Sequence, residues 1–330
     1  MSHEIKKLDK VVATEKTWHG LEQIVEAITF ENSGLNWDVE KRELFVPCDG
    51  TVCPVDGWQA IVRKDTHTVL NIPKKTYAII SNKRIWDALQ EALVGVNYKV
   101  VSAGSLQNCR KVFISVAIED KQDYVVNGDK FRNYISFITS HDGTLAFSVQ
   151  DVSLRCVCFN TVMASLAQGG GAVDLKVYHS KNNEFKIREM EVTLEDLFIK
   201  REEFYKSVEY LMNKPVSLDK ANQILAGFLG NGDELSTRVE NQVNELVGLF
   251  QHGKGNNGQT YHDLFCGVTE YFTHNASDNK QKLFVSNEIG SAGQKKVEFF
   301  NLLLDDNALN QLANRGDALL KARQQAVVFA

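Results

Sequence analysis

The sequence predicts an α+β fold: an antiparallel sheet with a β-β-β-α core, followed by a mostly helical C-terminal part. Two observations predict this class. Three segments between residues 110 and 158 are rich in Phe, Ile, Val and Tyr, which favour strands. After residue 190 the apolar residues recur at helical spacing. We therefore expect a sheet domain over residues 1–190 and a helical region over residues 191–330 that packs on it.

The chain before the core mixes helical and extended patterns. Apolar residues predict a short helix over Leu21–Phe30, and the period changes to two from Asn36 onward. Strands are then predicted over residues 36–47, 58–73 and 76–81. Residues 82–94 return to helical spacing, and Ser81 or Asn82 can cap that helix.

The predicted core consists of three strands, at residues 111–118, 131–143 and 144–159. The links between them contain Asn-Gly and Asp-Gly, at residues 126–129 and 141–144, and both dipeptides favour hairpin turns. After Cys158 the spacing becomes helical. A helix should therefore start near Asn160 and end at the glycine run that follows.

The remainder begins with two more predicted strands, at residues 172–180 and 183–191. Thr193 and Asp196 have capping-box spacing and should open a long amphipathic helix. Thr260 and Asp263 have the same spacing. Further helices are predicted over residues 218–229, 234–250, 260–272, 292–304 and 307–324.

Composition limits the location of the protein and its chemistry. No run approaches the 18 or so apolar residues of a membrane span, and the N-terminal residues lack the apolar stretch of a signal peptide. We therefore expect a cytoplasmic protein without a cofactor. Its cysteines should be thiols there. The pairs Cys48/Cys53 and Cys156/Cys158 either form a zinc site or are buried and hairpin thiols, and Cys-x-Cys is poor zinc spacing.

The sequence contains no familiar catalytic signature. The run Ser140-His141-Asp142-Gly143 holds a hydroxyl, an imidazole and a carboxylate. Adjacent strand residues point to opposite faces, so these three cannot form a triad among themselves. The run is either a hairpin turn, with His141 at a strand end, or a place where His141 contacts a ligand or phosphate.

Basic and aromatic residues alternate along the predicted core. Such a surface can hold a single strand of nucleic acid, with charges for phosphates and rings for bases, and a net charge of −5 does not exclude this. The alternative is a solvated sheet face above core aromatics. Arg155 either pairs with a carboxylate or lines an anion-binding groove, and Asn160 either caps the predicted helix or receives phosphate there. The candidate nucleic-acid-binding residues are Arg110, Lys111, Lys130, Arg132, Tyr134, Phe137, His141, Arg155 and Asn160.

Several segments resemble one family in order along nearly the whole chain. These are Trp18-His19-Gly20 and residues 138–147 (ITSHDGTLAF), 155–166 (RCVCFNTVMASL) and 255–274 (GNNGQTYHDLFCGVTEYFTH). They resemble the phage/plasmid-like family called domain of unknown function 932, although Phe159 and Cys266-Gly267 depart from its pattern. The resemblance implies genes of bacteriophages and plasmids, and thus the host cytoplasm. The predicted β-β-β-α core also resembles, at fold level, single-strand annealing recombinases, which form rings or filaments on single-stranded DNA.

Three functions follow as hypotheses. The leading one is a single-stranded DNA-binding protein that acts as a homo-oligomer and anneals strands in recombination. The second is a phage protein that binds and inhibits a host defence protein, which suits the acidic helical part. The third is a metal- or His-dependent nucleic-acid enzyme using His141, Asp142 and His179 or His262.

Overall fold

The computed structural model of the chain confirms the α+β class and the helical C-terminal part. It describes residues 10–17, 20–119, 123–126, 128–155, 160–163, 175–181, 183, 187, 190–232 and 234–328. By its contacts the chain divides into two compact units. The first is Met1–Gln122, Asn133–Val152 and Ala172–Ile199, and the second is Asp123–Arg132, Ser153–Gly171 and Lys200–Ala330. Within the described residues, no helix is long and apolar enough to cross a membrane.

The larger sheet has the strand order β11-β10-β9-β7-β6-β1-β2, with β12 paired to β10 and β8 paired to β9. The central pairs β6–β7 and β7–β9 are antiparallel, and β1–β2 is parallel. The strands are β1 (Val11–Ala13), β2 (Gln23–Ile24), β6 (Tyr98–Leu106), β7 (Lys111–Ile118), β8 (Asp123–Val126), β9 (Asp129–Ser140), β10 (Phe147–Arg155), β11 (Asn160–Met163) and β12 (Leu175–Val177).

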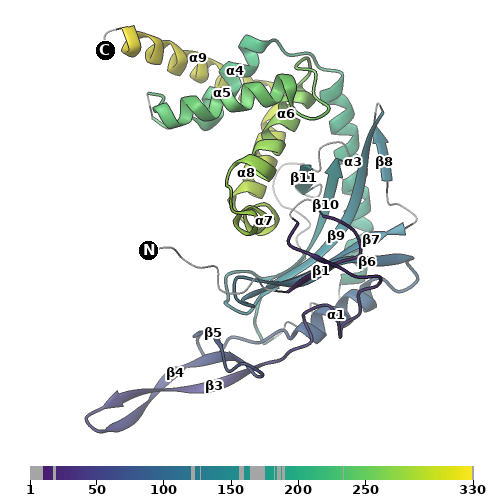
Figure 1. Cartoon of the computed structure of the whole chain (residues 1–330), viewed down its shortest axis with the longest axis vertical. Helices are drawn as coiled ribbons and strands as arrows, with labels where there is room; N and C mark the ends of the chain where they lie inside the picture. Colours follow the sequence, from purple (N-terminus) through teal and green to yellow (C-terminus); the bar gives the residue numbers. More distant parts are fainter. Residues whose placement is uncertain are drawn as a thin grey trace. The chain divides into compact units, whose positions relative to one another are not determined.

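One face of this sheet is buried by α1 (Asn82–Ala92) in the first unit (Figure 1). Alternate β7 residues, Val112, Ile114 and Val116, join the apolar face of α1 in one core cluster. Ser81 caps the helix, since its hydroxyl accepts a hydrogen bond from the Arg84 amide, as the sequence predicted. Because this face of the sheet is buried, the register between its strands is fixed, and so are the positions at which the connecting loops begin.

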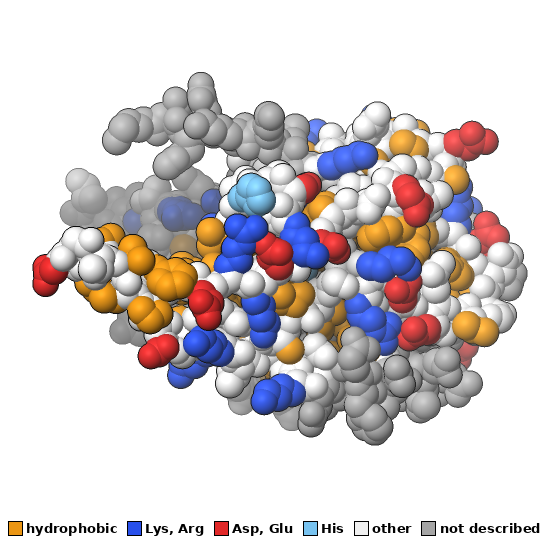
Figure 2. All heavy atoms as spheres, turned by 90° about the horizontal axis from the view of Figure 1, so that it is seen from below, with side chains coloured by type: hydrophobic (Ala, Val, Ile, Leu, Met, Phe, Trp, Pro, Cys, Tyr) orange, Lys and Arg blue, Asp and Glu red, His pale blue; other side chains and the backbone are white. Residues whose placement is uncertain are grey.

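A second sheet has the order β3-β4-β5, from β3 (Val39–Cys48), β4 (Thr51–Arg63) and β5 (Val69–Asn71). β5 pairs with β4 near Ile61 and Val62, and residues 73–75 bond to β4 between Gly57 and Gln59, so the outer part of β3–β4 is a two-stranded ribbon. We call β3–β4 the arm, and residues 43–57 the arm tip. Figure 2 shows the arm at the left, with apolar side chains gathered on it and acidic ones beside them.

The second unit is built mainly from helices packed on one apolar cluster. They are α3 (Met190–Met212, of which the part from Lys200 belongs here), α4 (Leu218–Leu229), α5 (Thr237–His252), α6 (Tyr261–Glu270), the π-helical turn η3 (Tyr271–Asn275), α7 (Lys280–Ile289), α8 (Ser291–Leu304) and α9 (Asp306–Val328). Thr260 and Asp263 form the predicted capping box at the start of α6.

Several predicted elements are not observed. Residues 21–30 form no helix: Gln23–Ile24 is a short strand beside β1. Residues 76–81 form no strand. No helix starts at Asn160, because Asn160–Met163 is the strand β11 next to β10, and the rest of that predicted helix lies outside the described residues. Thr193 lies inside α3 rather than at its start, and Asn183 and Ile187, predicted in a strand, are helical. Neither β6 nor α7 was predicted.

Candidate functional site

A pocket of about 430 Å³ lies in the first unit, between the segment that follows β5 and the segment that follows β12. A hydrogen bond from the Ala78 amide to the His179 carbonyl, 3.0 Å long, joins the two segments. The lining residues are Pro73, Lys74, Thr76, Tyr77, His179, Ser180 and Lys181. The site therefore combines two aromatic rings with two lysines.

Tyr77 and His179 form a stacked pair, with ring centroids 4.6 Å apart and an interplanar angle of 13°. The Tyr77 hydroxyl donates to the carbonyl of Ser140 at 3.1 Å. His179 Nδ1 lies 3.0 Å from the Ala78 carbonyl, which can only accept, so Nδ1 carries a proton. His179 Nε2 lies 3.3 Å from Thr139 Oγ1. Both rings are thus held in place by β9, and His179 also by the segment that follows β5.

The protonation of this pair follows from its burial. Desolvation lowers the pKa of His179 and, with a smaller effect of the Asp142 carboxylate, raises the pKa of Tyr77 above its ordinary value. At neutral pH the imidazole and the phenol are therefore both uncharged. They form an apolar, flat-sided wall rather than a charged acid–base pair.

The lysines supply the charge of the pocket. Lys74, Lys75 and Lys181 are exposed. The ion pairs seen among the described residues include none of these three lysines. The negative charge of the Asp142 carboxylate acts on Tyr77, whose pKa it raises. The carboxylate also accepts hydrogen bonds from the amide and hydroxyl of Thr144. The rim therefore has an excess of positive charge, which suits an anionic ligand.

Two of the sequence-predicted binding residues cannot contact a ligand. Phe137 is 0% exposed and belongs to the core cluster with α1. His141 is 1% exposed, and its Nε2 lies 2.8 Å from Asn82 Oδ1. Neither side chain reaches the surface, because Phe137 on β9 and His141, which follows β9, both point into the interior of the first unit.

The other predicted residues have different surroundings. Arg110 and Lys130 are exposed, Lys111 and Arg132 are half-buried, and the Tyr134 hydroxyl donates to Glu15 Oε1 at 3.2 Å. Arg110, Lys111 and Tyr134 belong to the first unit, and Lys130 and Arg132 to the second. Arg155 ends β10 and Asn160 begins β11, so Asn160 is no helix cap; the side chains of both lie outside the described residues.

The structure brings together part of the reactive set that the enzyme hypothesis named. Burial is the main cause that lowers the pKa of His141 to about 3. The nearby His179 lowers this pKa further, and the Asp142 carboxylate raises it by a smaller amount. His141 is thus neutral and enclosed, and His262 belongs to the other unit. Within the described part of the chain no group of three or more His, Cys, Asp or Glu residues could hold a metal ion. Cys156 and Cys158 lie outside that part.

Sequence reasoning did not assign the residues of this pocket to one site. The short runs Pro73-Lys74-Lys75 and His179-Ser180-Lys181 carry its charges, but about a hundred positions separate them. A lysine close to an aromatic side chain was the available signal in each segment. The hydrogen bonds between Ala78 and His179 and the stacked rings of Tyr77 and His179 join the two halves.

Comparison with known proteins gives one family. A family model described as domain of unknown function matches residues 69–301, which includes the pocket and begins after β4. No curated protein and no solved structure gives a significant match. The match covers most of the chain and agrees with the resemblance carried by residues 138–147, 155–166 and 255–274. The chain therefore belongs to the family described as domain of unknown function (DUF932).

Proposed function

We propose that this protein binds single-stranded DNA at the pocket beside Tyr77 and His179. One observation carries the proposal: an uncharged aromatic wall lies within a rim of exposed lysines that have no carboxylate partner among the described ion pairs. Single strands are held by this combination, because every base has a π face and every nucleotide has a phosphate.

The dimensions of the pocket support a base-sized ligand. Its volume of about 430 Å³ falls within the roughly 300–1,000 Å³ of small-molecule sites. Bases in a duplex are stacked on one another, so only an unpaired base can enter a pocket of this kind. Arg110 and Lys111, on the β6–β7 hairpin of the same unit, are candidates for further phosphate contacts. Lys130 and Arg132 are candidates in the second unit.

Binding of a fluorescent oligonucleotide, followed by anisotropy, tests the proposal. The double variant Lys74→Glu/Lys181→Glu should lose at least about tenfold in affinity, because two attractive contacts become repulsive. The matched control is Lys99→Glu, which changes an exposed lysine on β6 outside the pocket lining. Wild-type protein that shows no salt-dependent binding would refute the proposal. A more specific form of the proposed function is the annealing of complementary strands by an oligomer. A fluorescence-quenching assay measures annealing separately from binding.

A second candidate function, binding of a host protein, is favoured by the arm tip. Phe45, Val46 and Val52 expose 52%, 45% and 69% of their surfaces there. Large exposed apolar side chains that lie together mark protein interfaces. A host protein that co-purifies with the wild type, and fails to do so with Phe45→Ser/Val52→Ser, would support this function; equal recovery with both would exclude the arm tip as its site.

A further inference from the structure

One face of the arm tip carries four exposed apolar side chains. Cross-strand partners lie on the same side of a ribbon, and Phe45 pairs with Pro54 as Pro47 pairs with Val52. Side chains two residues apart also share a side. The four side chains Phe45, Pro47, Val52 and Pro54 therefore form one surface, and all four are exposed. This surface needs a partner from outside the ribbon.

The edges of the arm tip are poor sites for adding another strand. Pro47 lies on one strand and Pro54 on the other, and they are two of the four prolines in the chain. Proline has no backbone N–H group to give to a neighbouring strand. A partner therefore binds the apolar face of the tip rather than extending its sheet.

The charge of the arm tip selects a cationic partner. Residues 43–57 contain Glu43, Asp49 and Asp56 and no Lys or Arg, which gives a net charge of −3. Phosphate groups would be repelled by this segment, so it does not face nucleic acid. The required partner has an apolar surface rimmed by positive charge.

The chain itself provides such a surface. The pocket has Pro73 and the uncharged Tyr77 in its wall and Lys74 and Lys181 at its rim, with Lys75 next in sequence. We propose that the outer end of the arm tip of one copy docks in the pocket of a second copy, with Asp49 facing its lysines. The proposal depends on the pocket and its lysines, and it does not require that the pocket bind DNA.

The outer end of the arm tip, from Phe45 to Pro54, cannot reach the pocket of its own chain. The Lys75 amide donates to the Gly57 carbonyl at 2.9 Å, so the lysine segment lies beside the middle of β4. From Gly57 the strand runs away toward Asp49, about 25 Å at about 3.3 Å per residue. Cross-strand pairing of residues 45–48 with 51–54 holds it extended. The contact must therefore join different molecules.

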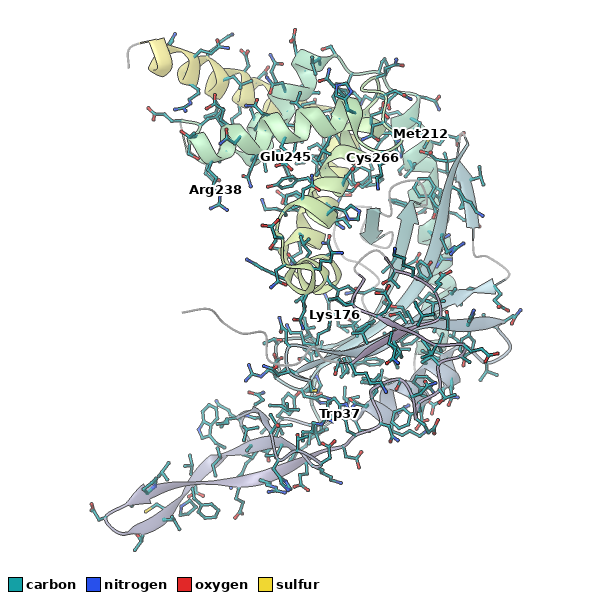
Figure 3. All side chains as sticks on the ribbon, viewed as in Figure 1. Trp37, Lys176, Met212, Arg238, Glu245 and Cys266 are labelled. Atoms are coloured by element: carbon teal, nitrogen blue, oxygen red, sulfur yellow. The ribbon has the colours of Figure 1, made fainter. Side chains whose placement is uncertain are left out.

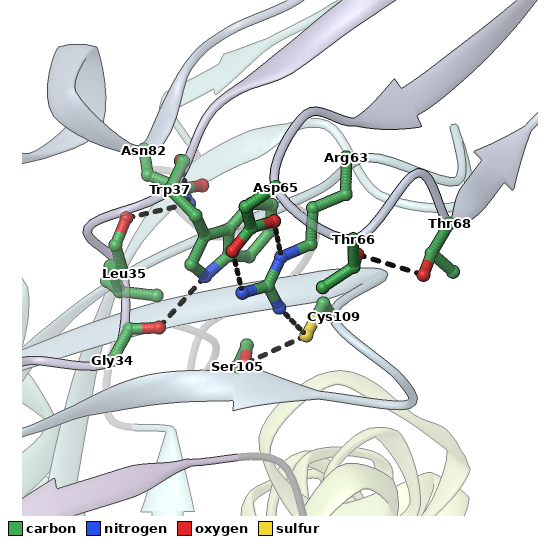
Figure 4. Close-up of polar contacts among 10 residues, drawn as sticks. All are labelled: Gly34, Leu35, Trp37, Arg63, Asp65, Thr66, Thr68, Asn82, Ser105 and Cys109. Atoms are coloured by element: carbon green, nitrogen blue, oxygen red, sulfur yellow. Dashed lines mark hydrogen bonds and ion pairs between the residues drawn. The ribbon is translucent and has the colours of Figure 1, made fainter.

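The base of the arm is fixed, so the tip is presented in a defined direction. Arg63, the last residue of β4, makes two bonds to the Asp65 carboxylate, at 2.6 and 2.7 Å, and donates to Cys109 Sγ at 2.8 Å (Figure 4). The Arg63 guanidinium also lies over the Trp37 ring, 4.5 Å from its centroid. Figure 3 shows Trp37 where the arm joins the rest of its unit. A pre-organised arm loses little freedom when it docks.

The proposed contact allows each molecule to have two neighbours. Tip and pocket are different surfaces, so each molecule can give its tip to one neighbour and accept the tip of another, which builds rings or open chains. A ribbon tip covers less area than a standard interface of about 1,600 Å², so we expect micromolar association. Because the same lysines would serve both partners, DNA and the arm tip should compete for the pocket.

Sedimentation velocity over a concentration series, up to about 100 µM, tests the contact. The wild type should associate reversibly. The tip variant Asp49→Lys and the pocket variant Lys74→Glu/Lys181→Glu should each remain monomeric. An equimolar mixture of the two should associate again, because both of its cross-contacts pair opposite charges. Lys99→Glu should behave as the wild type does.

Two further measurements separate this inference from the proposed function. Far-UV circular dichroism confirms that each variant is folded, and the apolar variant Phe45→Ser/Val52→Ser should weaken association at least about tenfold without any change of charge. Oligonucleotide binding should survive in the tip variants. Monomeric wild type at the highest concentration, or variants that associate as the wild type does, would overturn the inference even if DNA binding is normal. Association without DNA binding would instead refute only the proposed function.

Discussion

His141 Nε2 lies 2.8 Å from Asn82 Oδ1 in the interior of the first unit. The Asn82 amide nitrogen donates to the carbonyls of Leu35 and Trp37, so its oxygen is left to accept. His141 Nε2 therefore carries a proton. Through this bond the end of β9 is tied to the start of α1 and to the chain segment that leads into the arm.

The stability of the protein should depend on pH through His141. Its pKa is about 3 in the folded state, because burial disfavours the charged ring, against 6.5 in an unfolded chain. Below pH 6.5 the unfolded state binds a proton that the folded state does not. The free energy of unfolding therefore decreases as the pH is lowered from 6.5 to about 3. The loss should approach about 1.4 kcal/mol per pH unit, measured by urea unfolding at about pH 7 and about pH 5.

The variant His141→Gln is the control for this prediction. Glutamine can still donate to Asn82 but does not titrate. The variant should be less stable at neutral pH and should lose less stability between the two pH values than the wild type. His179, whose pKa is also lowered by burial, contributes a dependence of the same sign that remains in both proteins. Equal slopes in the two proteins would show that His141 is not the titrating group.

Replacement of Arg63 should loosen the base of the arm. In Arg63→Met the ion pair with Asp65, the contact with the Trp37 ring and the bond to Cys109 are lost, and we expect a destabilisation of about 1–3 kcal/mol. Arg42→Met is the matched control, because the Arg42–Glu40 pair on the same arm is exposed and should cost at most about 0.5 kcal/mol. Urea unfolding measures both; similar losses would mean that the Arg63 cluster does not anchor the arm.

The helices α4 and α9 cross at glycines that admit no side chain. A Cβ atom on Gly316 would overlap the carbonyl oxygen of Gln223, and one on Gly227 would overlap that of Leu312. Gly316→Ala should therefore destabilise the second unit by at least about 2 kcal/mol. Gly248→Ala on α5, where a Cβ meets nothing within 4 Å, should instead stabilise by about 0.5–1 kcal/mol. Thermal unfolding followed by circular dichroism distinguishes the two signs.

The salt dependence of oligonucleotide binding should report the pocket lysines individually. Each lysine that neutralises a phosphate contributes about −0.7 to the slope of log K against log salt concentration. Lys74→Gln and Lys181→Gln should each make the slope shallower by about that amount, whereas Lys99→Gln should leave it unchanged. Slopes that are identical in all three variants would place the phosphates elsewhere.

Local signals in the sequence predicted local structure correctly. Ser81 caps α1, and Thr260 and Asp263 form a capping box, because these bonds join residues three positions apart. Strand patterns identified β7, β9 and β10 for a similar reason: one face of each alternates into a core. The errors arose where distant pairing decided the outcome. Gln23–Ile24 pairs with β1 and Asn160–Met163 lies beside β10, and each pairing overrides a local helical pattern.

The sequence by itself determined the α+β class, the helical C-terminal part and the family. Apolar periodicity, helix caps and the segments that match the family each depend on residues that are close together in the sequence. Only the tertiary structure decided which polar and aromatic side chains face solvent. It buried Phe137 and His141, and it joined Tyr77 to His179 across about a hundred residues. The physical reason is that burial and pocket formation depend on which strands and loops become neighbours, and strand alternation alone does not specify the neighbours of either face.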